Sequence, residues 1–384
     1  MKNSDLQSLV GYAKTPLQRE YIQAFIDYGS YQAAADALGV TKKAIKSAVH
    51  RIKAYYREEP TEQAHKGATS TLYGADGDVK LQWVKRDALT MEELRDEIYQ
   101  AMLEEIPRVK PAATTHKGAS SERAQFLTNQ YLITDYHLGM LSWPEETGEK
   151  WNTEIAEQML VDWFKYAIEQ SPPAQYCIFA QLGDFLHYDS MEAVTPTAKN
   201  LLDSDTRYAN VVRAAVRVVR RVIEMLRTKY QTTHVIMAEG NHDMASSIWL
   251  REMLAAMYED VSDVTVDTSV SPYYRMVFGK VALFYHHGHK CKMERLPEVL
   301  ASEFPMDYGC TQHRYAHVGH LHYDKVVESG LMRVEQHRTL AARDAYSSRA
   351  GYKSQREAKV ITYDSQYGEV SRLCITPEMI YEAL

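Results

Sequence analysis

Residues 234–243 read HVIMAEGNHD, a short apolar run followed directly by glycine, asparagine, histidine and aspartate. The run 234–238 predicts a buried strand, because β-branched and apolar residues fit a strand that is covered on both faces. The polar block then falls on the loop at the end of that strand, where α/β proteins place their ligands. Amide oxygen and imidazole are donors that suit Mn²⁺, Fe²⁺ and Zn²⁺.

The same arrangement occurs twice upstream. A predicted strand at 130–134 ends in Asp135-Tyr136-His137, and a predicted strand at 176–181 ends in Gly183-Asp184. Predicted helices at 153–170 and 206–230 separate the three strands. Alternation of strand and helix is typical of an α/β domain.

Two histidine blocks follow downstream, His286-His287-Gly288-His289 and Gly319-His320-Leu321-His322. Further strands are expected within 264–285, and 323–375 is interpreted largely as strand and turn. Any single block could be a helix-capping carboxylate, an ordinary turn or a structural histidine. All five in one chain favour a pair of metal ions about 3.5–4 Å apart, which can clamp both oxygens of a phosphoryl transfer.

Taken in order, the blocks resemble the calcineurin-like metallophosphoesterase superfamily, whose pattern is D-x-H, G-D-x-x-[DH], G-N-H-[DE], a histidine block and G-H-x-H. The resemblance covers about 130–375. It implies a four-layer αββα fold, a β-sandwich flanked by helices, within a domain at 126–384. It also implies two divalent ions, with Mn²⁺ expected and Fe²⁺ or Zn²⁺ as alternatives.

The resemblance assigns a role to each residue of the pattern. The first ion would be bound by Asp135, His137 and His322, and Asp184 would bridge both ions. The second ion would be bound by Asn241, His320 and His287, with His286 as the competing candidate. His242 would contact the scissile phosphate and protonate the leaving oxygen, with Asp243 fixing its orientation.

The residues after Asp184 bear on the substrate. Related phosphoprotein phosphatases carry a V-D-R-G run here, whereas this chain has Phe185-Leu186-His187-Tyr188 and no arginine. Gly-Asp-x-x-His is more similar to the nuclease subunit of the double-strand-break repair complex. That resemblance implies an active-site role for His187, whose alternative is packing beside the metals. Losing a phosphate-clamping arginine favours diesters, which carry one charge where monoesters carry two.

The N-terminal residues 1–60 are predicted to form a small all-α domain that resembles a helix-turn-helix. Ser30 and Thr41 are suited to cap helices, and Gly39 is suited to the turn between them. The DNA-contacting residues would be Lys42, Lys43, Lys46 and Arg51. The alternative is a helical interaction or dimerisation module with a solvated basic face.

Between the two domains, 61–107 is interpreted as a hairpin and a helix, and 108–125 as a linker. The hairpin pairs 70–73 with 79–84 through a turn at Asp76-Gly77, and could serve as a wing or as a docking element. The helix is expected at 90–105.

Composition limits the partners. The 384 residues carry a net charge of −7, so binding to nucleic acid requires local basic patches. Four scattered cysteines, no signal-peptide pattern and no long apolar run predict a cytoplasmic protein without a membrane span. A local basic set follows the last block, interleaved with two tyrosines: Arg333, Arg338, Arg343, Arg349, Lys353 and Arg356, with Tyr346 and Tyr352. It either binds nucleic acid or forms a solvated loop.

The hypothesis that unites these features is a DNA nuclease guided by an N-terminal DNA-binding module, in which metal-activated hydroxide attacks a phosphodiester. A helix-turn-helix joined to a phosphoesterase resembles proteins of phage genomes. One alternative is a phosphomonoesterase or cyclic-nucleotide phosphodiesterase. Another is a non-catalytic DNA-binding adaptor. The repair nucleases dimerise, so a homodimer stays open.

Overall fold

The computed structural model describes Val10, Ala13 and residues 15–57, 69–73, 79–84 and 122–381. The chain folds as two compact units, Met1–Thr90 and Met91–Leu384. The turn expected at Asp76-Gly77, the helix expected at 90–105 and most of the linker lie outside the described residues. Within those residues, no helix is both long enough and apolar enough to cross a bilayer.

The first unit contains the three expected helices, α2 (Pro16–Tyr28), α3 (Tyr31–Leu38) and α4 (Lys42–Arg57). The Ser30 hydroxyl accepts the Ala33 N–H at 3.1 Å, as expected of an N-cap. Gly39 ends α3 with φ 66°, a left-handed conformation that glycine adopts without strain. The buried core comprises Ile22, Ala34, Ala35, Ile45, Val49 and Ile52. The hairpin is also confirmed: β1 (Thr69–Tyr73) pairs antiparallel with β2 (Val79–Val84).

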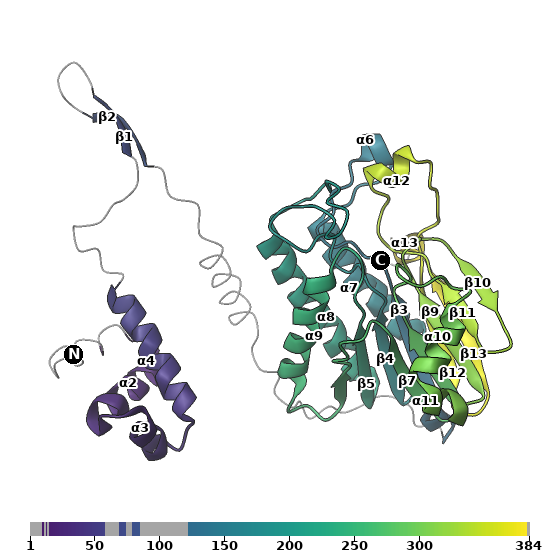
Figure 1. Cartoon of the computed structure of the whole chain (residues 1–384), viewed down its shortest axis with the longest axis horizontal. Helices are drawn as coiled ribbons and strands as arrows, with labels where there is room; N and C mark the ends of the chain where they lie inside the picture. The colour runs from purple at the N-terminus through teal and green to yellow at the C-terminus, as the bar shows by residue number, and fades with distance from the viewer. Residues whose placement is uncertain are drawn as a thin grey trace. The chain divides into compact units, whose positions relative to one another are not determined.

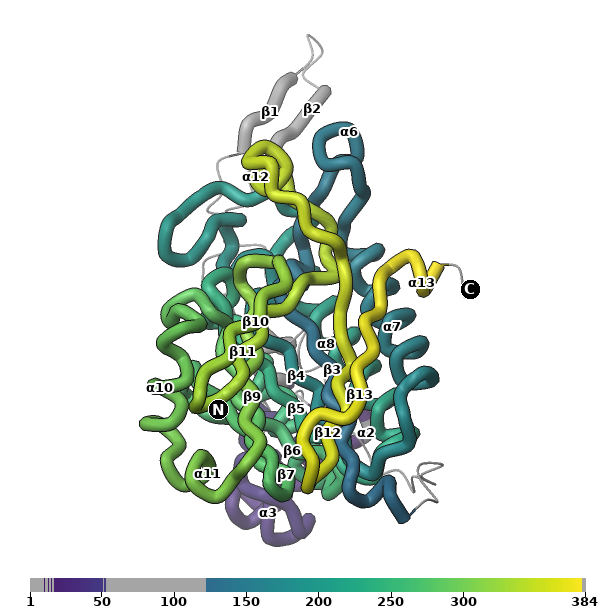
Figure 2. Tube along the Cα trace, turned by 90° about the vertical axis from the view of Figure 1, so that its right-hand side faces the viewer, coloured from purple at the N-terminus to yellow at the C-terminus, as the bar shows by residue number. Residues whose placement is uncertain are grey.

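In the second unit, the described residues begin with the 3-10 helix η2 (Glu122–Phe126), and the unit is built on two mixed sheets (Figures 1 and 2). The six-stranded sheet has the order β13-β12-β3-β4-β5-β6, with β3 (Leu127–Ile133), β4 (Tyr176–Gln181), β5 (Thr232–Met237), β6 (Val264–Val266), β12 (Ala358–Asp364) and β13 (Gly368–Ile375). The five-stranded sheet has the order β10-β11-β9-β8-β7, with β7 (Tyr274–Phe278), β8 (Val281–Tyr285), β9 (His313–Val318), β10 (Lys325–Glu328) and β11 (Arg333–Gln336).

The helices cover the outer faces of the two sheets. Against the six-stranded sheet pack α7 (Thr153–Gln170), α8 (Tyr208–Lys229), α9 (Met244–Tyr258) and α13 (Pro377–Tyr381). Against the five-stranded sheet pack α10 (Leu296–Glu303) and α11 (Pro305–Cys310). Figure 1 shows α8 and α9 on one side of the strands and α10 and α11 on the other.

Alternating side chains explain the layers. On β3, Tyr131 and Ile133 pack against the helices, whereas Leu132 between them packs against the other sheet. On β8, Leu283 faces the six-stranded sheet and Phe284 faces α10. Because successive side chains of a strand point to opposite faces, a strand covered on both faces carries apolar side chains on both of them. The expected four-layer αββα fold is therefore confirmed.

Some elements differ from the expectation. The strand at 176–181 and the helix at 153–170 have the expected bounds, and Asn152 caps that helix through the Ile155 N–H at 2.8 Å. Segment 323–375 is largely strand and turn, as expected, and also contains the short helix α12 (Ala345–Arg349). α12 packs against α6 (Pro144–Thr147), which lies far away in sequence. A helix held by such a distant contact need not show the apolar periodicity from which helices are predicted, so neither segment indicated this contact.

Candidate metal centre

The loops that carry the predicted metal ligands meet at one end of the second unit. β3, β4 and β5 are parallel, so Asp135, Asp184 and Asn241 follow the same ends of neighbouring strands. The loops pair with one another beyond the strands: Asp135 N–H donates to Gly183 O and His137 N–H donates to Asp184 O, both at 3.0 Å. The parallel pair β8 and β9 brings in the two histidine blocks from the other sheet.

Five of the predicted ligands have a left-handed backbone: Asp135, His137, Asp184, His320 and His322, with φ between 49° and 75°. Lys199 is the one other non-glycine residue with positive φ in the described part of the chain. Such a conformation costs on the order of 1–3 kcal/mol per residue and collects at functional sites. The backbone alone therefore marks these loops as a site.

The side chains form two groups of donor atoms. Asp135, His137 and His322 make the first group, and Asp184, His287 and His320 make the second, with the donor atoms of each group within 4.8 Å of one another. Asn241 stands beside the second group, with Oδ1 3.1 Å from Nε2 of His287. Each group has the mixture of carboxylate and imidazole that binds Mn²⁺, Fe²⁺ or Zn²⁺.

The two oxygens of Asp135 have different surroundings. Oδ2 accepts the Thr134 hydroxyl at 2.5 Å and the His320 N–H at 2.8 Å. Oδ1 is buried and accepts no hydrogen bond from the described residues, and it lies 3.1 Å from His322 Nε2. A buried carboxylate oxygen without a donor is costly unless a cation satisfies it. The residues present therefore fit a metal ion at Oδ1.

The structure distinguishes His287 from His286. His287 Nε2 lies 3.1 Å from Asp184 Oδ2, and its Nδ1 lies 2.9 Å from the Leu182 carbonyl oxygen. His286 instead accepts the Gly288 N–H through Nδ1 and stacks on Tyr273. Although burial lowers the pKa of His287, Asp184 and Asp135 raise it to about 10. The position of Nε2 therefore attracts positive charge, which favours His287 as the ligand.

Two glycines allow the loops to approach this closely. A Cβ on Gly240 would lie 2.0 Å from Asp184 Oδ1 and 2.2 Å from its backbone nitrogen. A Cβ on Gly183, which has φ 105°, would lie 2.5 Å from His287 Nδ1. Both contacts are far inside van der Waals distance, so each motif requires its glycine.

Asp243 does not orient His242, contrary to the expectation from the resemblance. Its carboxylate accepts four backbone N–H groups, from Asp184, Phe185, Leu186 and Gly240. It therefore joins the Gly-Asp block to the Gly-Asn-His-Asp block. Because this carboxylate is committed to the loops, α9 is capped by Asp189, which accepts the N–H groups of Ala245 and Ser246.

His242 is oriented by a backbone carbonyl. Its Nδ1 lies 2.8 Å from the His187 carbonyl oxygen, and its backbone N–H donates to Asp184 Oδ1 at 2.7 Å. A carbonyl only accepts, so Nδ1 of His242 carries the hydrogen. Nε2 is then the atom that can take up or deliver a proton.

The His187 side chain is buried behind the ligands. Its Nδ1 lies 3.3 Å from His137 Nδ1, and burial lowers the pKa of His187 to about 3, with His242 as the next cause. The contact occupies Nδ1 of His137 and leaves Nε2 for a cation. Outer residues that fix the ring of a ligating histidine are a regular part of metal sites. The geometry favours a positioning role for His187.

His289 was not predicted from the sequence. Both of its ring nitrogens are buried and have no hydrogen-bond partner among the described residues. Its ring centroid lies 5.2 Å from that of His287 and 6.2 Å from that of His320. The sequence feature that could have drawn attention to His289 is its position two residues after His287, within the histidine block.

The predicted DNA-contacting lysines belong to the first unit. Lys42, Lys43 and Lys46 are exposed on α4, and the side chain of Arg51 lies outside the described residues. The basic set after the last block is largely neutralised in the structure. Its ion pairs include Arg338 with Glu357, Arg349 with Glu146 and Arg356 with Glu149.

A separate cluster of potential ligands, His317, Glu335 and His337, is buried between the sheets. Glu335 already accepts Lys359 Nζ at 3.0 Å and both terminal nitrogens of Arg372 at 2.5 and 2.8 Å. His317 Nδ1 lies 2.9 Å from His337 Nε2. Two cationic side chains satisfy the carboxylate, so the cluster is a structural polar network.

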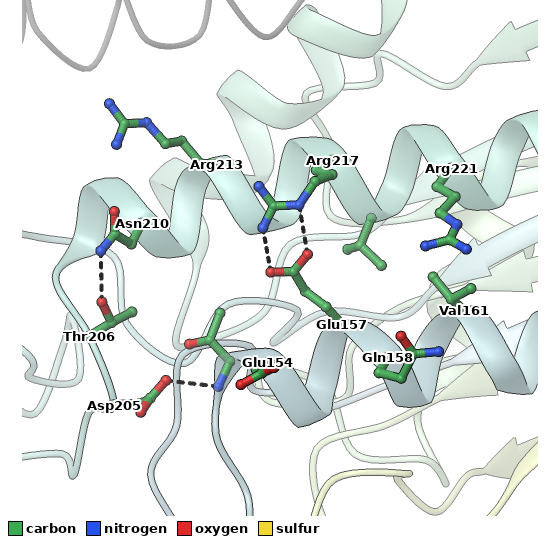
Figure 3. A pocket seen from close by; sticks show the side chains of 12 residues that line it. Glu154, Glu157, Gln158, Val161, Asp205, Thr206, Asn210, Arg213, Arg217 and Arg221 are labelled. Carbon is green, nitrogen blue, oxygen red and sulfur yellow. Dashed lines mark hydrogen bonds and ion pairs between the residues drawn. The ribbon is translucent and has the colours of Figure 1, made fainter.

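A separate groove of about 610 Å³ lies between α7 and α8 (Figure 3). Arg217 donates to both carboxylate oxygens of Glu157 across it, at 2.8 and 2.5 Å. Its charged lining residues are Arg213, Arg217, Arg221, Glu154, Glu157 and Asp205. The opposite charges balance, and no histidine or cysteine lines the groove. Its lining residues therefore do not form a histidine- or cysteine-containing metal site.

No protein-family model matches the sequence, and no curated protein matches it either. Solved structures overlap its second unit at low identity. An archaeal phosphodiesterase has 13% identity and a TM-score of 0.32 over 64% of this chain and 99% of that chain. Vacuolar protein sorting 29 from Cryptosporidium parvum has 14% identity and a TM-score of 0.30 over 65% and 98%. A predicted phosphoesterase from Streptococcus pneumoniae has 8% identity and a TM-score of 0.28 over 65% and 98%. At these values the overlaps identify no activity.

Proposed function

We propose that this protein is a two-metal phosphodiesterase that cleaves DNA. The observation that carries the proposal is the meeting of the two donor groups, Asp135–His137–His322 and Asp184–His287–His320, at the loop end of both sheets. Asn241 adds an amide oxygen to the second group. When bound, two divalent ions would supply Lewis acidity and lower the pKa of a water molecule toward neutrality.

The surroundings of Asp184 support a diester as the substrate. The two residues that follow it, Phe185 and Leu186, are buried in the core, and their backbone N–H groups bind Asp243. The loop therefore presents no arginine at the position where the phosphoprotein phosphatases place one. A diester, with one negative charge, needs no such clamp.

His242 is the group assigned to the leaving oxygen. Replacing it with alanine is expected to lower kcat about 10²–10⁴-fold, the usual contribution of a general acid, while bound metal is retained. The measurement is Mn²⁺-dependent hydrolysis of bis(p-nitrophenyl) phosphate and of DNA, together with metal content. His313→Ala, far from the ligand groups at the start of β9, is the matched control. Unchanged DNA cleavage by His242→Ala would remove His242 from the mechanism.

The first unit supplies the reason for DNA as the substrate. Lys42, Lys43 and Lys46 are exposed on one helix, so they can contact phosphates together. Changing all three to alanine is expected to weaken DNA binding by the full chain. The negative slope of log affinity against log salt should become shallower by about 2–3, since each lost phosphate contact removes roughly 0.9 from its magnitude. Exposed Lys199, in the second unit, is the control. An unchanged slope would favour a helical interaction module instead.

A substrate panel separates the alternatives. Hydrolysis of small monoesters alone would favour a phosphomonoesterase, and hydrolysis of cyclic nucleotides alone would favour that class of diesterase. DNA binding without bound metal or turnover would favour a non-catalytic adaptor.

A further inference from the structure

Large apolar side chains are exposed on the loops that carry the metal motifs and on the neighbouring helices α9 and α12. They are Leu141, Trp143, Met191, Leu201, Ile248, Leu321, Tyr323, Tyr346 and Tyr352. Scattered exposed apolar residues are ordinary, but a group of them on the loops of one site marks a binding surface.

Three of the aromatic rings belong to one projecting structure, which we name the flap: Trp143 with α6, and α12 with the residues that follow it as far as Tyr352. α6 and α12 lie side by side in both views (Figures 1 and 2). Arg349 forms an ion pair with Glu146 at 2.6 Å, and the Ser348 hydroxyl donates to the Glu146 carbonyl at 2.9 Å. These contacts give the flap a defined conformation.

The two segments of the flap begin close to the metal centre in the chain. The Thr339 hydroxyl donates to the Asp135 carbonyl at 2.7 Å, and the two segments then run outward together. They meet again where the Ser142 hydroxyl donates to the Arg343 carbonyl at 2.7 Å, next to Trp143. The flap is thus joined to the metal centre through the contact between Thr339 and Asp135.

The chemistry of the flap selects a ligand with flat rings. Trp143, Tyr346 and Tyr352 are 61%, 72% and 63% exposed, and the two tyrosine rings lie 6.5 Å apart. Aromatic side chains hold single-stranded nucleic acid by stacking on unpaired bases, whatever the sequence. In a duplex the bases already stack on one another, so the rings gain contact only with a single strand.

We propose that the flap is a base-stacking platform that selects single-stranded nucleic acid and holds the strand with a phosphodiester at the metal centre. This proposal rests on the proposed phosphodiesterase function and names its substrate as a strand with unpaired bases.

The test compares Trp143→Ala, Tyr346→Ala and Tyr352→Ala in the full chain. The readout is kcat/KM for a single-stranded oligonucleotide divided by kcat/KM for bis(p-nitrophenyl) phosphate, which has no base. Each variant is expected to lower this ratio about tenfold, since one stacked base contributes roughly 1–3 kcal/mol. Tyr346→Phe keeps the ring and should keep the ratio.

Tyr367→Ala is the matched control. Tyr367 is 75% exposed in the β12–β13 turn, beside the start of β8 and so at the opposite end of the sheets from the ligands. An unchanged ratio in all three flap variants, or equal losses in Tyr346→Phe and Tyr346→Ala, would overturn the platform. Losses on duplex as large as on single strands would overturn the selection for unpaired bases. If the wild-type protein hydrolyses neither substrate with Mn²⁺, the phosphodiesterase proposal itself fails.

Discussion

Replacing Asp184 with asparagine is expected to abolish metal-dependent phosphodiester hydrolysis and to reduce bound metal. Asp184 belongs to the second donor group, and the resemblance makes it the bridge between two ions. Asparagine has nearly the same shape but no charge, and Oδ1 can still accept the His242 N–H. Loss of a supporting residue around a metal costs roughly 10–100-fold. A shared ligand should cost more, so we expect kcat to fall by more than about 100-fold.

Turnover of bis(p-nitrophenyl) phosphate and metal content by mass spectrometry measure this effect. Asp260→Asn, an exposed carboxylate just after α9, is the control and should behave as the wild-type protein does. Two metal ions per chain with full turnover in Asp184→Asn would contradict the assignment of the bridging ligand.

The second large effect concerns stability. Glu335→Ala is expected to lower the free energy of unfolding by about 1–3 kcal/mol, because it removes the carboxylate that buried Lys359 and partly buried Arg372 share. Each cation keeps one other partner, Asp324 for Lys359 and Glu369 for Arg372. Urea unfolding followed by circular dichroism measures the change. Glu328→Ala is the control, since its side chain is 72% exposed and 3.9 Å from Arg333. It should change stability by less than about 0.5 kcal/mol.

The same cluster predicts the direction of the pH dependence. Burial would raise the pKa of Glu335, but His337, Arg372 and Lys359 together hold it well below its usual range. A lowered carboxyl pKa gives stability that is present above the unfolded value of about 4.3 and is lost as pH falls. The difference between wild type and Glu335→Ala should therefore shrink below about pH 4. A difference that grows on acidification would contradict the ion pairs.

The fold was predictable wherever the local pattern carries the information. The helix at 153–170 has a polar N-cap and a regular apolar stripe, and the strand at 176–181 is apolar from Cys177 to Ala180, so both have their expected bounds. The helix α9 was not predicted. Its exposed Ile248 and buried Arg251 break the separation of polar from apolar faces on which a helix prediction depends.

The site was predictable as a set of donors but not as a network. The order of the five blocks identified the residues that the two donor groups contain. It could not show that Asp243 binds the backbone of a loop 58 residues away, or that Glu146 holds Arg349 across 203 residues. Such contacts depend on the packed sheets, and no local pattern reports them.

The left-handed ligands have a consequence for engineering. Glycine would relieve the backbone at Asp135, His137, Asp184, His320 and His322, so a search for thermal tolerance by substitution would be drawn to these five positions. Each gain there would remove a predicted metal donor. At these positions, higher thermal stability and metal binding require different residues. Stabilising substitutions should therefore be sought in the helices.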